Sequence, residues 1–126
     1  MPALILGTYS GAASNPRRNS WQGKPVMDVT EIRTKSALVR SKIPGVDYVI
    51  NPYLGCSHGC RYCYAVFMRK YSHQHRSAAW GSFMEVKINL TEVLRAELRR
   101  KKETGRAMLS SVCDPYQPAE CTYYLT

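Results

Sequence analysis

The sequence has no long apolar run and no sign of an export signal. No apolar stretch approaches the roughly 18 to 20 residues that a membrane-spanning helix requires, so we expect no membrane partner. The opening segment is apolar only from Ala3 to Leu6 and has no basic residue before Arg17, unlike a secretory signal peptide. Repeats and compositional signs of disorder are missing as well. We therefore predict a cytoplasmic chain that forms one ordinary domain.

Acidic side chains are scarce: 9 stand against 18 basic ones, which gives a net charge of +9. Residues 1–55 carry seven basic and three acidic side chains (+4), residues 56–106 carry eleven and four (+7), and residues 107–126 carry none and two (−2). A positive surface attracts polyanions, so DNA or another nucleic acid is an expected partner. A solvated basic surface without a binding role explains the charge equally well.

Cysteines are few and strongly clustered. Of the 5 in the chain, Cys56, Cys60 and Cys63 fall within the segment GCSHGCRYCYA, at C-x3-C-x2-C spacing. A reducing compartment keeps thiols free, so such a cluster indicates metal ligands rather than disulfides. The segment follows a short predicted strand, which places it in a loop at the end of that strand.

Three metal sites are compatible with this spacing. His58 can complete a Cys3His zinc site, although all four ligands would then come from one short loop. A ferredoxin-like cluster needs a fourth thiolate, for which Cys113 and Cys121 are the candidates. If neither binds, three thiolates on a four-iron cluster leave one iron open to a small molecule.

The pattern of apolar residues predicts an irregular N-terminal extension over residues 1–47, followed by alternating strands and helices. The expected elements are a brief strand in Asp47–Tyr53, a helix over Tyr64–His75, a strand over Met84–Asn89, a helix from an N-cap at Thr91 to a close at Gly105, and a buried strand over Ala107–Val112. This order predicts an α/β fold with a parallel sheet or barrel, whose functional loops lie at the carboxyl ends of the strands.

Three stretches in the expected order resemble the radical S-adenosylmethionine (SAM) superfamily, specifically its spore photoproduct lyase-like branch. They are INPYLGCSHGCRYCYA, VKINLTEVLRAEL and DPYQPAE. The resemblance implies that Cys56, Cys60 and Cys63 ligate a 4Fe-4S cluster and that SAM chelates the fourth iron. It also implies reductive cleavage of SAM to a 5′-deoxyadenosyl radical, an electron donor such as flavodoxin or ferredoxin, and lyase action on a DNA photoproduct as a candidate reaction.

The same resemblance gives roles to neighbouring residues. Tyr62 matches the position near the SAM adenine, and Asp114, or less favourably Glu120, matches a contact to the SAM amino group. Independently of the resemblance, Gly55 and Gly59 allow the backbone to wrap closely around a cluster. A core contact for Tyr62, and ordinary turns for the glycines and the Asp114 segment, are the structural alternatives.

Cys113 stands where the family pattern has threonine. A small buried thiol is the favoured interpretation, and a hydrogen-atom donor is the functional alternative. We interpret Cys121 as incidental, and no other catalytic residue is predicted.

Length limits how much of the family's barrel this chain can form. A (β/α)8 barrel takes about 250 residues, or roughly 30 per unit. Residues 48–126 therefore correspond to the first two to three units of a partial (β/α)6 TIM-like barrel. We expect a truncated N-terminal portion with an open strand edge and no terminal helix. If this portion cannot hold the cluster by itself, it is inactive.

Overall fold

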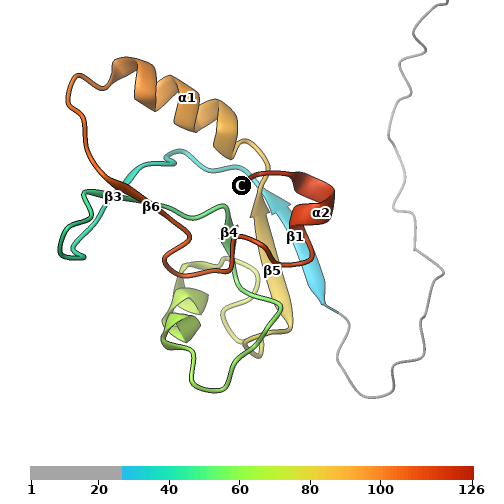
Figure 1. Cartoon of the computed structure of the whole chain (residues 1–126). Coiled ribbons are helices and arrows are strands. Elements are labelled where there is room, and N and C mark those ends of the chain that lie inside the picture. The colour runs from blue at the N-terminus through green and yellow to red at the C-terminus, as the bar shows by residue number, and fades with distance from the viewer. Residues whose placement is uncertain (1–26) are drawn as a thin grey trace, which may run out of the picture.

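The computed structural model describes residues 27–126, which form two three-stranded sheets and three helical segments. The first sheet has the order β1–β5–β4 (Figure 1), and the second has the order β2–β3–β6. Each sheet contains one parallel and one antiparallel pair, so the described residues form a mixed α/β structure without a closed barrel. Among these residues no helix is long and apolar enough to cross a bilayer.

The first sheet is centred on β5 (Phe83–Lys87), which is parallel to β1 (Asp28–Ile32) and antiparallel to β4 (Tyr53–Leu54). The expected irregular extension is corrected here, because β1 lies within it and pairs along its whole length with β5. Residues 1–26 of that extension lie outside the described part. Phe83 to Val86 are all buried because both faces of β5 are covered. His75 contacts Phe83 and Glu85, and the C-terminal residues Tyr123 and Leu125 pack against the cluster that contains Met84 and Val86. The alternation of apolar and polar residues in this segment therefore indicated less burial than β5 has.

The expected strand over Asp47–Tyr53 is divided between the two sheets. β3 (Tyr48–Ile50) pairs with β2 (Val39–Arg40) and β6 (Ala107–Leu109), whereas β4 joins the first sheet. Pro52 separates β3 from β4, and without an N–H it cannot continue a ladder. Along the chain, β4 therefore lies between β3 and the clustered cysteines.

The predicted buried strand over Ala107–Val112 is wrong in length and in burial. β6 ends at Leu109 because Ser110 adopts a left-handed conformation with φ of 62°. All three of its residues are exposed, and within residues 27–126 β6 pairs on one side only, with β3. The expected open strand edge is therefore present at β6 among the described residues.

The helix after the cysteines is shorter and tighter than predicted. It is a 3₁₀ helix, η1 (Tyr64–Tyr71), and it does not extend to His75. Ser72 ends it by donating its N–H to the carbonyl of Arg69, and the chain then turns so that Ser72 and His75 reach the first sheet.

Helix α1 (Leu90–Arg100) is an α-helix as predicted, with different ends. Asn89 rather than Thr91 is the N-cap residue, and its side chain bonds the backbone N–H and C=O of Thr34 instead of the helix. At the other end Lys101 leaves the helical path, and its ammonium lies 3.9 Å from the centre of the Tyr48 ring. This cation–π contact holds the helix end to β3. Because Lys101 is the C-cap residue, Gly105 does not cap the helix.

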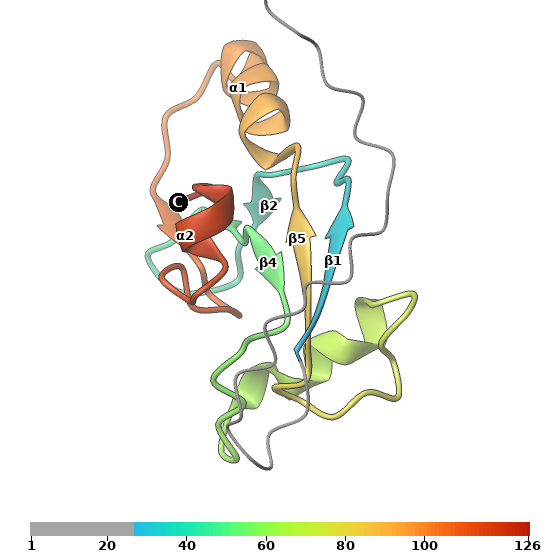
Figure 2. The ribbon, with the colours of Figure 1, turned by 90° about the vertical axis from the view of Figure 1, so that its right-hand side faces the viewer.

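The C-terminal residues return to the core, contrary to the expectation that no helix follows DPYQPAE. Helix α2 (Glu120–Tyr123) lies beside β4 (Figure 2). Tyr123 and Leu125 pack against a buried cluster of Tyr53, Met84 and Val86. The hydroxyl of Tyr53 donates to the Glu120 carboxylate, which ties α2 to the first sheet.

A buried histidine joins β1, β5 and the turn after η1. His75 Nδ1 lies 3.0 Å from Glu85 Oε1, and its Nε2 lies 3.0 Å from Asp28 Oδ2. The ring also stacks on Phe83 at a centroid distance of 4.8 Å. Burial by itself lowers the pKa of His75, but hydrogen bonds to the two carboxylates outweigh it and raise the pKa above its ordinary value.

This raised pKa predicts that stability depends on pH. The protonated ring is favoured in the folded state, so its contribution is complete below about pH 6.5 and is lost as the pH rises through the folded-state pKa. We expect the urea midpoint of the protein to fall between pH 6 and pH 9. A His75→Gln variant should have a lower midpoint at pH 6 and a weaker decline, and an equal decline in both proteins would contradict the assignment.

Candidate functional site

The cysteine loop, residues 55–63, begins directly after β4 and leads into η1. Cys56 is buried, Cys60 and Cys63 are half-buried, and all three thiols are free. The N–H of Cys63 donates to the carbonyl of Cys60 at 3.1 Å, which closes a turn between these two residues. The structure thus places the three predicted ligands in one loop at the end of a buried strand, as the sequence indicated.

Close backbone contact with a second loop shapes the cysteine loop. Gly55 and Gly59 both have positive φ, of 98° and 55°. A Cβ on Gly81 would lie 2.6 Å from the Cα of Gly59, so these two backbones meet where no side chain fits. Gly81 was not anticipated from the sequence, because nothing in the segment AAWGSF relates it to residues 55–63.

The DPYQP turn is bound to the cysteine loop by two side chains. His58 Nε2 lies 2.7 Å from Asp114 Oδ2, and Gln117 Oε1 accepts the N–H of Ser57 at 3.1 Å. Asp114 also accepts the N–H of Tyr116 through Oδ1 at 2.8 Å. Asp114, predicted to contact SAM, therefore lies beside the cysteine loop and is paired with His58. No sequence signal indicated the His58–Asp114 pair or the role of Gln117.

Two other predicted positions differ in exposure and in partners. The Tyr62 side chain is 91% exposed, which excludes the alternative that it is a core contact and leaves it free for a ligand. Glu120 accepts the Tyr53 hydroxyl and the N–H of Thr126, so its carboxylate serves the attachment of α2. Burial first, and then the Glu120 carboxylate, raise the pKa of Tyr53 well above its ordinary value.

The remaining cysteines occupy different environments. Cys113 packs against the Tyr53, Met84 and Val86 cluster, and its thiol lies 3.8 Å from Asn51 Oδ1. Burial raises the pKa of this thiol, which favours its neutral form. Cys121 is exposed on α2. The structure thus places Cys113 as a half-buried thiol packed against the core, beside the DPYQP turn.

The donor set and its surroundings suit a thiolate-held cluster. Three free thiols are grouped in one loop, and the buried Gln117 Nε2 has no hydrogen-bond partner among the described residues. Hydrogen bonds from amide donors to cluster sulfurs tune the reduction potential of iron–sulfur sites. The oxygen of this same amide accepts the N–H of Ser57, the residue that follows Cys56. Over residues 27–126, however, no three Cys, His, Asp or Glu side chains are already arranged around a common point. Neither the three-cysteine set nor the Cys3His set with His58 is therefore preassembled.

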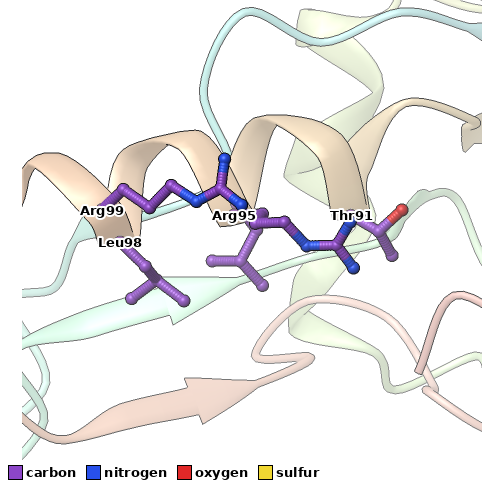
Figure 3. Close-up of a pocket in the computed structure, with 5 residues that line it drawn as sticks. Thr91, Arg95, Leu98 and Arg99 are labelled. Atoms are coloured by element: carbon purple, nitrogen blue, oxygen red, sulfur yellow. The ribbon is translucent and has the colours of Figure 1, made fainter.

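A second surface of interest is the outer face of α1. A shallow depression there is lined by residues of this helix alone: Thr91, Leu94, Arg95, Leu98 and Arg99. Arg95 and Arg99 extend along the helix axis, and Leu98 points away from them (Figure 3). Both arginines are exposed, and no acidic side chain lines the depression. This face concentrates part of the positive charge that the sequence distributes over two thirds of its length.

Comparison with known proteins found relatives but no assigned family. The uncharacterized protein MJ0683 of Methanocaldococcus jannaschii is 39% identical over 100 residues, which cover 79% of this chain and 36% of the relative. The uncharacterized proteins Mb2609c of Mycobacterium bovis and Rv2578c of Mycobacterium tuberculosis are each 40% identical over 103 residues, covering 75% of this chain and 29% of theirs. The chain thus spans about a third of the length of these relatives. No protein-family profile and no solved structure matches it.

Proposed function

We propose that this chain is the N-terminal part of a radical SAM enzyme similar to spore photoproduct lyase, in which Cys56, Cys60 and Cys63 hold a 4Fe-4S cluster. The observation that carries the proposal is the three free thiols in one glycine-bounded loop, with Asp114 and Gln117 bound to that loop from the DPYQP turn. When bound, the cluster would supply the electron that cleaves SAM. A partial (β/α)6 barrel, a cytoplasmic location and a flavodoxin or ferredoxin donor belong to the same proposal.

The residues around the loop would bind and orient SAM. Tyr62 exposes an aromatic ring one position before Cys63, where it can stack on the adenine. Asp114 offers a carboxylate to the amino group, and His58, which already pairs with that carboxylate, keeps it beside the loop. Glu120 is the less favoured candidate for this role, because its carboxylate already accepts the Tyr53 hydroxyl and the N–H of Thr126.

Product analysis tests the proposed activity. The protein, reconstituted anaerobically with iron and sulfide and reduced with dithionite, should convert SAM to methionine and 5′-deoxyadenosine, measured by liquid chromatography. Protein without cluster supplies the background. A colourless protein that binds stoichiometric zinc and leaves SAM intact would instead support the zinc-binding alternative with His58.

We further propose that DNA or another nucleic acid binds the exposed arginines of α1. The logarithm of the binding constant falls linearly with the logarithm of the salt concentration. For each phosphate that an arginine no longer neutralises, the magnitude of this slope should decrease by about 0.9 on duplex DNA. We expect the double change Arg95→Ser and Arg99→Ser to weaken binding at about 50 mM salt and to decrease the magnitude of this slope by about 2. Fluorescence anisotropy of labelled DNA measures both effects. The change Arg106→Ser removes one charge outside this helix and is the control, which should leave the slope almost unchanged. An unchanged slope in the double variant would contradict the proposal.

A further inference from the structure

A second cavity, separate from the cysteine loop, lies between η1 and the second sheet. Its volume is about 400 Å³, within the range of small-molecule sites. Its walls come from the segment 37–39, β3, η1, the end of β5 and the segment after β6. The lining residues are Ala37, Val39, Val49, Asn51, Phe67, Met68, Tyr71, Lys87, Ser111 and Val112.

Most of this lining is apolar, and one wall is aromatic. Phe67 and Tyr71, both on η1, are 47% and 56% exposed although they line a cavity. Val39 and Val49, paired across β2 and β3, form another wall. Such a surface suits a flat ring, since aromatic faces bind rings by stacking or edge contacts.

Lys87 is the only charged residue of the lining, and its ammonium has no partner within the described part of the chain. No carboxylate lies within ion-pair distance of it in residues 27–126, and none lines the cavity. Desolvation by burial lowers the pKa of Lys87 below its ordinary value, so this amine has lost water without gaining a salt bridge.

Two other polar side chains of the cavity, Asn51 and Ser111, are used within the protein. Asn51 Nδ2 donates to Ser111 Oγ at 3.2 Å, and Asn51 Oδ1 accepts the N–H of Val112 at 3.1 Å. These bonds fix the segment after β6 against the end of β3. Lys87 therefore supplies the positive charge of this lining, which can bind an acidic part of a ligand.

We propose that this cavity binds a small ligand with an aromatic ring and one acidic group, the ring against Phe67 and Tyr71 and the acid on Lys87. The site is distinct from the SAM contacts of the cysteine loop. Its use for the enzyme's substrate rests on the proposed function, but binding itself needs neither cluster nor SAM. Failure of this test therefore leaves the cluster proposal intact, and failure of the cluster proposal leaves this site intact.

Two fluorescent probes with similar rings distinguish the contribution of charge to binding from the contribution of apolar contact. 8-Anilinonaphthalene-1-sulfonate carries one acidic group, and N-phenyl-1-naphthylamine carries none. Titrated into the protein without cluster, the sulfonate should bind more tightly. Lys87→Met should weaken the sulfonate at least about tenfold, as expected for a charge-assisted hydrogen bond, and leave the neutral probe unchanged. Phe67→Ala should weaken both probes.

Further variants keep the test decisive. Lys42→Met, at an exposed lysine outside the cavity, should change neither affinity. Lys87→Arg retains the cation and should retain the preference for the sulfonate, even if Lys87→Met fails to fold. Equal affinities for the two probes, a sulfonate affinity unaffected by Lys87→Met, or displacement of the sulfonate by SAM would overturn the proposal.

Discussion

Replacement of any one of Cys56, Cys60 and Cys63 by serine is expected to abolish cluster binding. A hydroxyl is a poor substitute for a thiolate, and a cluster held by three protein ligands has none to spare. After anaerobic reconstitution the unmodified chain should contain about four iron atoms, and each variant less than one. Iron and sulfide analysis, with the visible absorption of the cluster, measures the effect.

The other cysteines are controls that discriminate between the metal sites. Cys121→Ser, on exposed α2, should retain full iron content. Cys113→Ser should also retain it, because that thiol packs on the core cluster rather than in the loop. Loss of the cluster in either of these variants would identify a fourth protein ligand and favour an electron carrier over an enzyme.

A single methyl group on Gly81 is expected to disrupt the cysteine loop from outside it. The added Cβ would lie 2.6 Å from the Cα of Gly59, and the φ of 93° disfavours any L side chain. Backbone strain alone costs about 1–3 kcal/mol, and the clash with Gly59 comes in addition. We expect Gly81→Ala to lower the free energy of unfolding by more than this strain and to reduce iron loading severalfold.

Gly45→Ala separates strain from the clash. Gly45 also has a positive φ, of 78°, but a Cβ there would have no neighbour within 4 Å. This variant should lose only the strain energy in a urea titration and should load iron normally. Equal losses of stability and of iron in the two variants would show that the Gly59–Gly81 contact does not shape the site.

Local sequence signals grouped the candidate ligands in one loop because these residues lie close together in the sequence. The spacing of Cys56, Cys60 and Cys63, and the position of the loop after a strand, were evident from a short segment. Helix α1 was also evident, since its apolar positions recur at helical spacing. Its ends were not, because Asn89 and Lys101 are engaged by Thr34 and Tyr48, which lie far away in sequence.

Contacts between distant segments explain what the sequence could not predict. The pairing of β1 with β5 and the packing of Tyr123 on the core depend on which surfaces meet, not on local propensity. The Ser57–Gln117 and Gly59–Gly81 contacts join residues separated by 60 and 22 positions, so no local pattern reveals them. The partial barrel itself stays a prediction, since the described residues form two small sheets.

The EPR spectrum of the reduced, reconstituted protein, recorded with and without SAM, tests the central claim most directly. If three thiolates leave one iron open, SAM binds that iron and must shift the g values of the cluster signal. A variant such as Asp114→Asn should need more SAM for the same shift. A cluster whose spectrum is unchanged by saturating SAM, or a protein that takes up zinc and no iron–sulfur cluster, would contradict the claim.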